Sequence, residues 1–431
     1  MDFAYSARVE ELRTRLQDFM DAHIQPADAA WKHEVEAGRY PTALVDGLKA
    51  RAKEAGLWNL FLPALKQGEP GTRLSNLEYA PLAEIMGRIF WSSEVFNCNA
   101  PDTGNMEILH MFATPEQRER WLNPLLNGEI RSCVGITEPG VASSDPTNLQ
   151  TTIIRDGDDY VINGRKWWTT GALHPKAKLC IVMGLSDTAP DADPHKRHSM
   201  IIVPMDAPGL TVMRNLPLLN HYSIEGHTET DFNNVRVPAA NLLGEEGAGF
   251  ALAQARLGPG RIHHCMRTIG QCEVALELMI ERALDRKAFG RHLSDYANVQ
   301  DWIAEGRMEI DQARLLCLRA AWMMDKYGNK AARTEVSAIK VVAARLQTKI
   351  ADRAMQVFGA GGLSNDTPLA FIYSWGRALR FIDGPDEVHL RTVARSEIKK
   401  RRESNRSTFD EQGVLRPHVK ASASCPPASP D

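Results

Sequence analysis

The chain has 431 residues, which predicts roughly two to four structural units rather than one compact domain. A formal net charge of -3 excludes a nucleic-acid partner held by bulk charge, and 43% hydrophobic with 24% charged residues excludes global disorder. No apolar run approaches the roughly 18 residues of a membrane span, and the N-terminal stretch lacks the apolar core of a signal peptide. Seven scattered cysteines without a CxxC pair predict reduced thiols in a cytoplasmic protein and no zinc or other metal site.

Helical periodicity opens the chain and continues to about residue 130. Apolar residues recur at three- and four-residue spacing along the first helix, at Val9, Leu12, Leu16 and Phe19. Pro115 is expected in the first turn of a helix that is capped by Thr114. We therefore predict an N-terminal helical domain over residues 1–130.

Short β-prone runs replace the helical period after Arg131. Turn signals at Asp156-Gly157 and Asn163-Gly164 predict hairpins. Further strand-like runs cover residues 178–184, 199–205, 210–213 and 227–237. We predict a central antiparallel, barrel-like β domain over residues 131–245.

The helical period returns from about Phe250 and lasts for most of the remaining chain. Two long apolar seams are typical of helices in an antiparallel bundle. Their residues are Ile303, Ile310, Ala313, Cys317, Ala320 and Met324, then Val336, Ile339, Ala343, Leu346, Ile350, Ala354 and Val357. We predict a C-terminal four-helix bundle over residues 246–410 and a disordered tail over residues 411–431. The expected fold class is α+β, with one β domain between two helical domains.

Two candidate ligand-binding stretches flank the first β runs. Small and hydroxylated residues crowd the segment from Val134 to Asp145, where exposed backbone N–H groups could cradle an anion or a heterocycle edge. A tight loop between domains explains the same composition. Trp167-Trp168-Thr169-Thr170 ends a predicted strand, and only one of the two indoles is expected to enter a given site. Two core tryptophans are the alternative.

Two further candidates lie at helix ends in the bundle. Residues 286–290 (RKAFG) close a helix expected to begin near Arg261, and the arginine could reach a phosphate or only complement the helix dipole. Residues 356–362 (QVFGAGG) superficially resemble a dinucleotide fingerprint. They follow a helical pattern rather than a strand, so the Rossmann arrangement is excluded. A glycine-rich helix end and a close approach to a ligand remain open.

Asp383 is the candidate general base. It lies between the apolar pair Phe381-Ile382 and a Gly-Pro turn, where partial desolvation is expected to raise the carboxyl pKa. A simple turn residue is the alternative. Asp386 and Glu387 are expected to be solvated or to cap the helix that follows.

Taken in order, these motifs resemble the acyl-CoA dehydrogenase family, closest to the branch of family members ten and eleven. The supporting stretches between about residues 94 and 400 are VFNCNAPDTGNMEILH, GITEPGVASSDPTN, YVINGRKWWTTG, RLGPGRIHHCMRTIG and IDGPDEVHLRTVA. The resemblance implies the three-domain plan above, with FAD held in extended form between the β domain and the bundle.

The resemblance also implies site residues. FAD contacts are expected at Val134, Ile136, Thr137, Ser143, Ser144, Trp168, Thr169, Thr170, Arg286, Phe289, Gln356, Ala360, Pro385 and Glu387. Of these, Arg286, Phe289, Gln356 and Ala360 would contact the FAD of a neighbouring subunit in a homodimer or homotetramer. Ser144, Arg261 and Gly384 would contact the substrate, and Asp383 aligns with the catalytic base.

The implied reaction is α,β-dehydrogenation of an acyl-CoA thioester to a trans-2-enoyl-CoA. Asp383 would remove the α-proton while a hydride leaves the β-carbon for the flavin, and an electron-transferring flavoprotein would accept the electrons. Three departures from the best-known members stand out. The loop at 141–144 is one residue longer, Ala297 lies where a flavin-contacting glutamine is common, and an aspartate stands where those members have a glutamate base.

Two other functions remain open. Nitroalkane oxidases share the fold and an aspartate base, so an oxidase with rapid oxygen consumption is the enzymatic alternative. A non-catalytic flavoprotein scaffold is the other, and a protein whose flavin never bleaches with an acyl-CoA would favour it.

Overall fold

The computed structural model describes residues 4–404, and an N-terminal set of helices opens the fold. Their bounds are α1 (Ala7–Phe19), α2 (Gln25–Glu36), α3 (Thr42–Glu54), α4 (Asn76–Gly87), α5 (Ser92–Val95), α6 (Asp102–Phe112), α7 (Pro115–Gln117) and α8 (Asn123–Leu126). The four apolar positions predicted on α1 are all buried. Thr114 caps α7 as predicted, because its side chain accepts a hydrogen bond from the Gln117 N–H.

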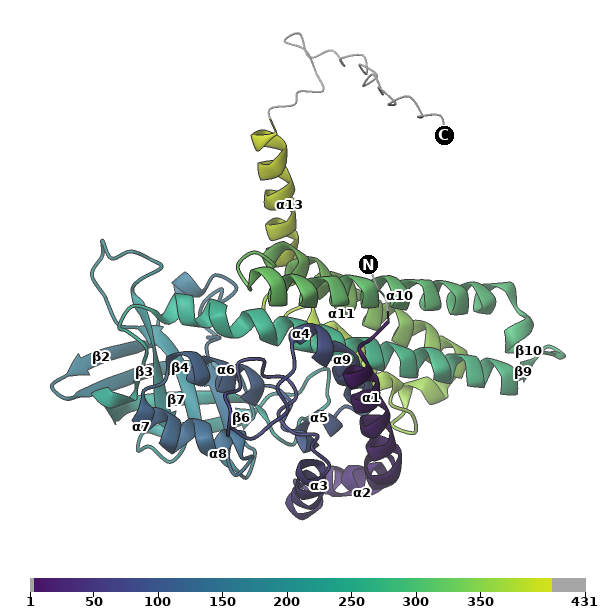
Figure 1. Cartoon of the computed structure of the whole chain (residues 1–431), viewed down its shortest axis with the longest axis horizontal. Coiled ribbons are helices and arrows are strands. Elements are labelled where there is room, and N and C mark those ends of the chain that lie inside the picture. Colours follow the sequence, from purple (N-terminus) through teal and green to yellow (C-terminus); the bar gives the residue numbers. More distant parts are fainter. Residues whose placement is uncertain (1–3, 405–431) are drawn as a thin grey trace, which may run out of the picture.

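A mainly antiparallel sheet follows and lies at the opposite end of the molecule from the far end of the bundle (Figure 1). Its strands are β1 (Arg131–Gly135), β2 (Thr152–Asp156), β3 (Asp159–Thr170), β4 (Ala177–Leu185), β5 (His198–Pro204), β6 (Leu210–Asn215), β7 (His227–Pro238) and β8 (Leu242–Leu243). The order is β6-β7-β3-β2-β4-β5-β8, and β1 pairs with β4. The β1–β4 pairing is parallel, which departs from the antiparallel pattern expected throughout.

The two predicted turns have different outcomes. Asp156-Gly157 does turn the chain, between the antiparallel partners β2 and β3. The turn predicted at Asn163-Gly164 is wrong, because these residues lie inside β3 at a register shift in its pairing with β7. Gly164 has a φ of +144°, and a Cβ there would lie 2.6 Å from the Thr151 hydroxyl, so the glycine serves a bulge and a close approach.

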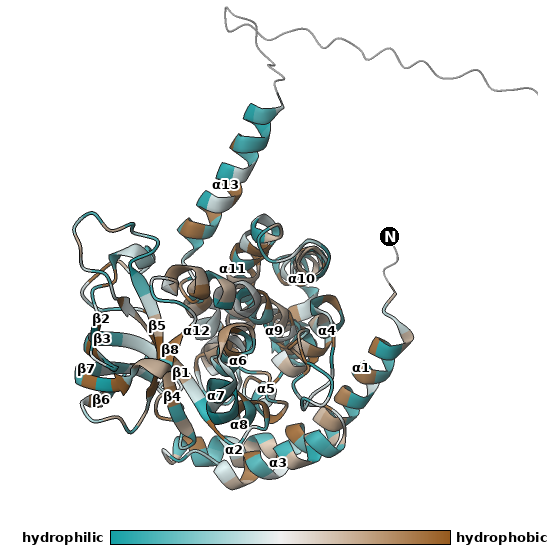
Figure 2. Ribbon diagram, turned by 60° about the vertical axis from the view of Figure 1, so that its left-hand side comes forward, coloured by the Kyte–Doolittle hydropathy of each residue, from teal (hydrophilic) through white to brown (hydrophobic). Residues whose placement is uncertain are grey.

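Long helices form the C-terminal part, and hydrophobic and hydrophilic residues are mixed along their ribbons (Figure 2). Many of the hydrophobic residues on these helices are buried. The helices are α9 (Gly249–Asp285), α10 (Ala297–Tyr327), α11 (Arg333–Phe358), α12 (Leu369–Leu379) and α13 (Asp386–Glu403). The seam predicted on α11 is buried at every position, and that on α10 at every position except Ile303, which is half-buried. A small hairpin, β9 (Lys287–Ala288) and β10 (Arg291–His292), follows α9.

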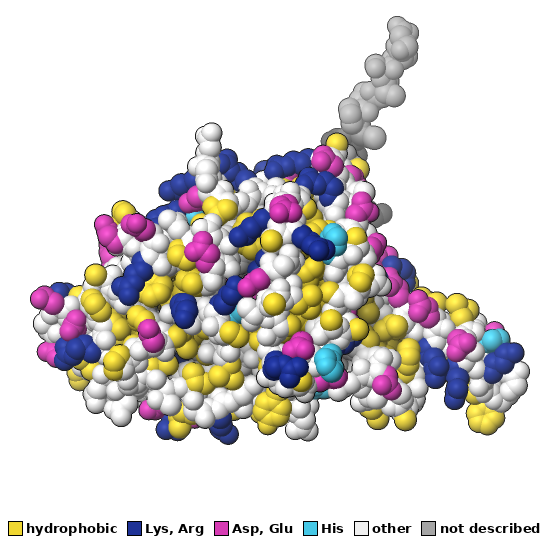
Figure 3. Space-filling view, turned by 90° about the horizontal axis from the view of Figure 1, so that it is seen from below, with side chains coloured by type: hydrophobic (Ala, Val, Ile, Leu, Met, Phe, Trp, Pro, Cys, Tyr) yellow, Lys and Arg dark blue, Asp and Glu magenta, His cyan; other side chains and the backbone are white. Residues whose placement is uncertain are grey.

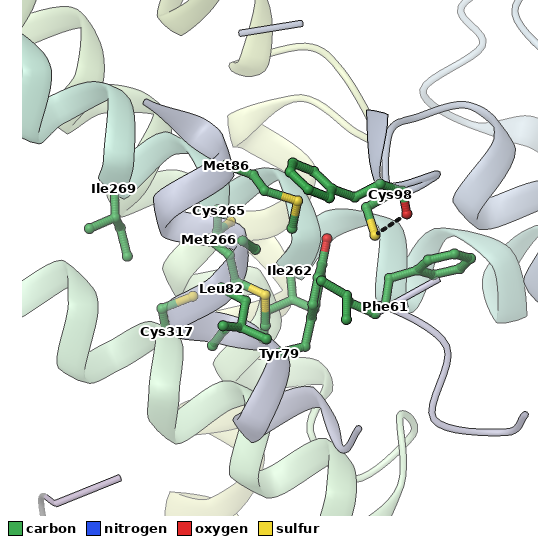
Figure 4. Packing of buried hydrophobic residues seen from close by; sticks show 14 of the residues in the cluster. Phe61, Tyr79, Leu82, Met86, Cys98, Ile262, Cys265, Met266, Ile269 and Cys317 are labelled. Carbon is green, nitrogen blue, oxygen red and sulfur yellow. Dashed lines mark hydrogen bonds between the residues drawn. The ribbon is translucent and has the colours of Figure 1, made fainter. Parts of the chain in front are cut away.

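The expected helix start near Arg261 is wrong, since α9 begins at Gly249. It crosses α4 at very short range. A Cβ on Gly87 would lie 2.1 Å from the Arg267 carbonyl oxygen, and a Cβ on Gly270 would lie 2.0 Å from the Glu84 carbonyl oxygen. Side chains of α4, α9 and α10 pack around this crossing to form the core that joins the N-terminal helices to the bundle (Figure 4).

Three whole-chain expectations concern cysteines, membrane and tail. The six cysteines among the described residues are free and buried, and Cys425 and the predicted tail lie outside those residues. No helix within residues 4–404 combines the length and apolarity needed to cross a membrane.

Acidic and basic side chains are interspersed on the face seen in Figure 3, which agrees with the near-zero net charge.

Candidate active site

A cavity of about 1780 Å³ lies where the three parts of the chain meet. It is lined by residues from the end of β1 and the loop after it, from the end of β3, from α9 and from the turn before α13. Among the predicted site residues, these are Val134, Ile136, Thr137, Ser143, Ser144, Trp168, Thr170, Arg261, Asp383, Gly384 and Pro385. The fold therefore gathers eleven predicted positions from four separate segments of the sequence.

A buried ion pair fixes the conformation of the loop that follows β1. Lys166 Nζ lies 2.7 Å from Glu138 Oε1 and donates a 3.0 Å hydrogen bond to the Ile136 carbonyl. The Glu138 carboxylate also accepts hydrogen bonds from the N–H groups of Gln150 and Thr151. Burial lowers the pKa of Lys166 to about 8, although Glu138 opposes the shift. With its turn fixed in this way, the loop can present backbone and hydroxyl groups to a ligand.

Both indoles at the end of β3 line the cavity, so the expectation that only one would enter is wrong. The alternation of the strand fails because Trp168 has a φ of +53° within a register shift between Lys166 and Thr169. The two ring centroids are 6.3 Å apart, and Trp168 is 39% exposed. The Trp167 Nε1 is buried, and no described residue accepts a hydrogen bond from it. An exposed aromatic face beside an unpaired donor suits a flat heterocycle with polar edges.

Thr170 contacts His227, which was not predicted from the sequence as a site residue. Its hydroxyl lies 3.0 Å from His227 Nδ1. The His227 ring is nearly parallel to Trp375 of α12, with centroids 6.4 Å apart. Burial lowers the pKa of His227 to about 4, so this wall of the cavity is neutral near pH 7.

Asp383 stands in the turn between α12 and α13 with its side chain 14% exposed. Its φ is +55°, a left-handed conformation, and the following Gly384 has a φ of +110°. The Arg261 Nε donates a 2.8 Å hydrogen bond to the Asp383 backbone carbonyl. Within residues 4–404, no hydrogen bond to the carboxylate oxygens is formed, and His264 Nε2 lies 3.7 Å from Oδ2.

Nearby charges determine the protonation state of this candidate base. Burial raises the pKa of the Asp383 carboxyl group, but His264, Arg256, Arg261 and Lys340 together outweigh burial and hold it below its usual value. Burial lowers the pKa of His264 to about 3, so near pH 7 the arginines and the lysine supply the positive charge. The raised pKa expected for Asp383 from the sequence is therefore wrong.

Several of these neighbours were missed because they sit inside helical patterns. Arg256 and His264 line the cavity from α9 together with Arg261, and Lys340 is a buried lysine of α11. His389 lines the cavity from α13 and is 2% exposed. The one available signal was the cluster of basic residues and histidines from Arg261 to Arg267.

Six predicted positions lie outside the cavity. Thr169 is buried in the sheet, 3.2 Å from the Thr230 hydroxyl, and Glu387 is exposed on α13. The others lie near the end of α9 and the end of α11, at the far end of the bundle from the sheet (Figure 1). They are Arg286, Phe289, Gln356 and Ala360, and the Phe289 side chain is fully exposed. A single chain does not bring these four to the cavity, so their contact with a neighbour's cofactor stays a prediction.

Asp386 differs from the expectation that it would be solvated or cap α13. It is 1% exposed, and Pro385 occupies the cap position. Its Oδ2 accepts hydrogen bonds from Arg345 Nε and Arg380 Nε, both at 2.9 Å. This acid therefore ties the start of α13 to α11 and α12.

Comparisons with known proteins agree with the architecture. The N-terminal, middle and C-terminal domain models of acyl-CoA dehydrogenase match residues 6–129, 133–235 and 247–398. A relative named "Probable acyl-CoA dehydrogenase FadE2" from Mycobacterium tuberculosis is 56% identical over 95% of this chain and 99% of its own length. Acyl-CoA dehydrogenase family member 11 of Homo sapiens is 48% identical over 92% of this chain, which spans only 51% of that protein.

Solved structures show the same fold. A structure from Mycobacterium abscessus is 50% identical with a TM-score of 0.87, covering 93% of this chain and all of that chain. Butyryl-CoA dehydrogenase from Megasphaera elsdenii is 25% identical with a TM-score of 0.78, covering 92% of this chain and all of that chain. All three parts of the chain are thus matched, and the protein belongs to the acyl-CoA dehydrogenase family, as an enzyme of that class.

Proposed function

We propose that the protein catalyses FAD-dependent α,β-dehydrogenation of an acyl-CoA thioester to the trans-2-enoyl-CoA. The observation that carries the proposal is the shared cavity. The carboxylate of Asp383, free of hydrogen bonds from described residues, lines the same space as the anchored loop after β1 and the exposed ring of Trp168. A base and a platform for a flat redox group are the two parts that this reaction needs.

The residues present fit FAD. An exposed indole, the buried unpaired Nε1 of Trp167 and the hydroxyls of Thr137, Ser143 and Thr170 offer one aromatic face and several polar edge contacts. The residues that would hold the cofactor within one subunit are Val134, Ile136, Thr137, Ser143, Ser144, Trp168, Thr170 and Pro385. FAD supplies the two-electron acceptor for the hydride that leaves the substrate β-carbon.

Asp383 takes the α-proton as its carboxylate becomes a carboxylic acid, and the electron pair of that C–H bond forms the new double bond. Arg256, Arg261 and Lys340 keep the carboxylate ionised before the substrate arrives. An acyl chain that fills the cavity displaces water from this carboxylate, which strengthens it as a base at the moment of reaction. Gly260 faces Asp383 in the cavity, and a Cβ at this position would contact Oδ2 at 3.4 Å. The glycine therefore keeps the space beside the carboxylate open for the substrate.

The assembly that completes the site is a homodimer or homotetramer in this proposal. The exposed Phe289 and the neighbouring Arg286 lie at the far end of the bundle, where a second copy can reach them. An electron-transferring flavoprotein is the proposed electron acceptor, because a two-electron flavin must be reoxidised between turnovers.

Anaerobic titration of the flavin absorbance with a panel of acyl-CoA thioesters tests the proposed function. Bleaching by at least one thioester, with the enoyl-CoA recovered as product, is the expected result. A flavin that no thioester bleaches would contradict the proposal and favour a scaffold. Rapid oxygen consumption with small nitroalkanes would instead identify a nitroalkane-oxidase-like enzyme.

A further inference from the structure

His264 of α9 faces the candidate base across the cavity. Its Nε2 lies 3.7 Å from Asp383 Oδ2, and the two side chains are only 9% and 14% exposed. The distance is longer than a hydrogen bond. Hydrogen bonds of catalytic groups are frequently long in ligand-free sites and shorten once the substrate is bound. A small side-chain movement is therefore enough to bring the two groups within hydrogen-bonding distance.

The neighbours of His264 determine which ring nitrogen carries the hydrogen. Arg267 NH2 lies 3.4 Å from His264 Nδ1, and a guanidinium has only donors, so Nδ1 is the acceptor. Arg267 is itself held by a 3.1 Å hydrogen bond from NH1 to the Cys98 carbonyl. Burial lowers the pKa of His264 to about 3, so the ring is neutral near pH 7. The single ring hydrogen therefore sits on Nε2, which faces Asp383.

Most other cationic or polar groups around Asp383 have partners elsewhere, although His389 Nε2 is buried without a hydrogen-bond partner among the described residues. Arg261 donates Nε to the backbone carbonyl of Asp383, and Arg256 donates Nε to Asn105 Oδ1 at 2.9 Å. Lys340 Nζ donates to the carbonyls of Leu379 and Gly384, and His389 Nδ1 lies 3.3 Å from Ser337 Oγ. These groups contribute charge or shape. The His264 Nε2–H is the donor that faces a carboxylate oxygen.

We propose that His264 is a positioning residue for the base: its Nε2–H holds Oδ2 of Asp383 and leaves Oδ1 to take the substrate α-proton. The inference deepens the proposed function and rests on it. A carboxylate at the end of a short, left-handed residue can rotate about its last bond. A neutral donor fixes that rotation without adding the charge of another cation, which would weaken the base.

Exchange of the substrate α-protons with D2O isolates the base from the redox step. The holoenzyme is first reduced chemically under anaerobic conditions, so that it cannot accept a hydride, and octanoyl-CoA is added as the probe. Deuterium at the α-carbon is then measured by mass spectrometry between pH 5 and about pH 10. His264→Phe keeps a ring and removes both nitrogens. His264→Gln places an amide N–H near the lost Nε2, whereas His264→Asn reaches only the position of Nδ1.

We expect His264→Phe to raise the apparent pKa of exchange by about one unit, because a hydrogen bond to the ionised form is lost. The plateau rate should fall about 10-fold to 100-fold as the carboxylate loses its orientation. His264→Gln should recover most of both effects and His264→Asn neither. The matched control is His263→Phe, because His263 is fully buried and packs against Phe61 and Tyr79, away from the cavity.

A His264→Phe variant with the wild-type pKa and plateau rate overturns the inference. Equal behaviour of His264→Gln and His264→Asn overturns it too, and that comparison decides the matter if the Phe variant fails to fold. Failure of the proposed function looks different. In that case the wild-type enzyme itself neither exchanges α-protons nor shows bleaching of its flavin with any thioester.

Discussion

Arg261 donates its Nε to the backbone carbonyl of Asp383 at 2.8 Å, so this arginine of α9 holds the main chain of the proposed base and not its carboxylate. The positive charge remains near enough to lower the pKa of Asp383, while the carboxylate oxygens stay free for chemistry. One contact therefore fixes the position of Asp383, and its carboxylate oxygens keep their capacity to accept a proton.

Replacing the base tests the centre of the proposed mechanism. Asp383→Asn is nearly isosteric and removes the proton acceptor, so reduction of the flavin by a good acyl-CoA substrate should slow by about 10²–10⁴-fold. Stopped-flow absorbance measures this step, and FAD content should be retained. Glu397→Gln, an exposed acid of α13, is the matched control. Wild-type reduction by Asp383→Asn would place the base elsewhere.

Asp386→Asn is expected to destabilise the protein, because Asp386 is buried between Arg345 and Arg380. Loss of charge-assisted hydrogen bonds from two partly exposed arginines should lower the free energy of unfolding by about 1–3 kcal/mol. Urea denaturation checks this, with Asp352→Asn on the exposed face of α11 as control. Equal stability of Asp386→Asn and wild type would show that the ion pairs contribute nothing.

Acid should destabilise the fold through histidines that are neutral when buried. Burial lowers the pKa of His227 and of His389 to about 4, whereas an unfolded histidine titrates near pH 6.5. Between these values the unfolded chain binds more protons, so stability is lost as the pH falls. Each histidine should remove roughly 2 kcal/mol between pH 7 and pH 5. Urea unfolding at the two pH values measures the loss, and His227→Gln should flatten its dependence on pH.

Arg286→Ala tests the cofactor contact expected between subunits. Removing one charge-assisted contact worth about 1.5–3 kcal/mol should weaken retention of FAD, measured by its release during dilution and filtration. Lys287→Ala, the next exposed basic residue, is the control. Sedimentation of the wild type should show an oligomer, and a monomer with a full complement of FAD would contradict the prediction.

The crossing of α4 and α9 should not tolerate a methyl group. A Cβ at Gly87 or Gly270 would lie about 2 Å from a backbone oxygen, so Gly87→Ala or Gly270→Ala forces two helices apart. The expected cost is about 1–3 kcal/mol or more in the free energy of unfolding. Gly47→Ala in α3 meets nothing within 4 Å and should instead stabilise the protein by about 0.5–1 kcal/mol. Equal stability of all three variants would show that the crossing adapts.

Periodicity predicted the elements that bury a repeating stripe. The seam of α11 and the four buried positions of α1 follow from three- and four-residue spacing alone. The Asn163-Gly164 turn failed because the dipeptide is equally suited to a bulge inside a long strand, and only pairing with β7 distinguishes the two. Local signals therefore predicted the elements but not every connection between them.

The candidate site was predictable where a motif is continuous in the sequence. The loop from Val134 to Ser144 and the turn at Asp383 both reach the cavity. His227 and Lys340 were missed because each reads as an ordinary strand or helix position until tertiary packing brings it to the base or the indoles. The environment of Asp383 reversed the expected direction of its pKa for the same reason, since Arg256 and Lys340 are distant in sequence.

The backbone at Asp383 also bears on why an aspartate occupies this position. A φ of +55° is costly for most side chains, but short polar residues such as aspartate and asparagine tolerate it. A longer or branched acid at this position would have to adopt the same conformation before it could act. The choice of acid is therefore governed by conformational preference as well as by proton affinity, and a change of base would have to be accompanied by a different turn between α12 and α13.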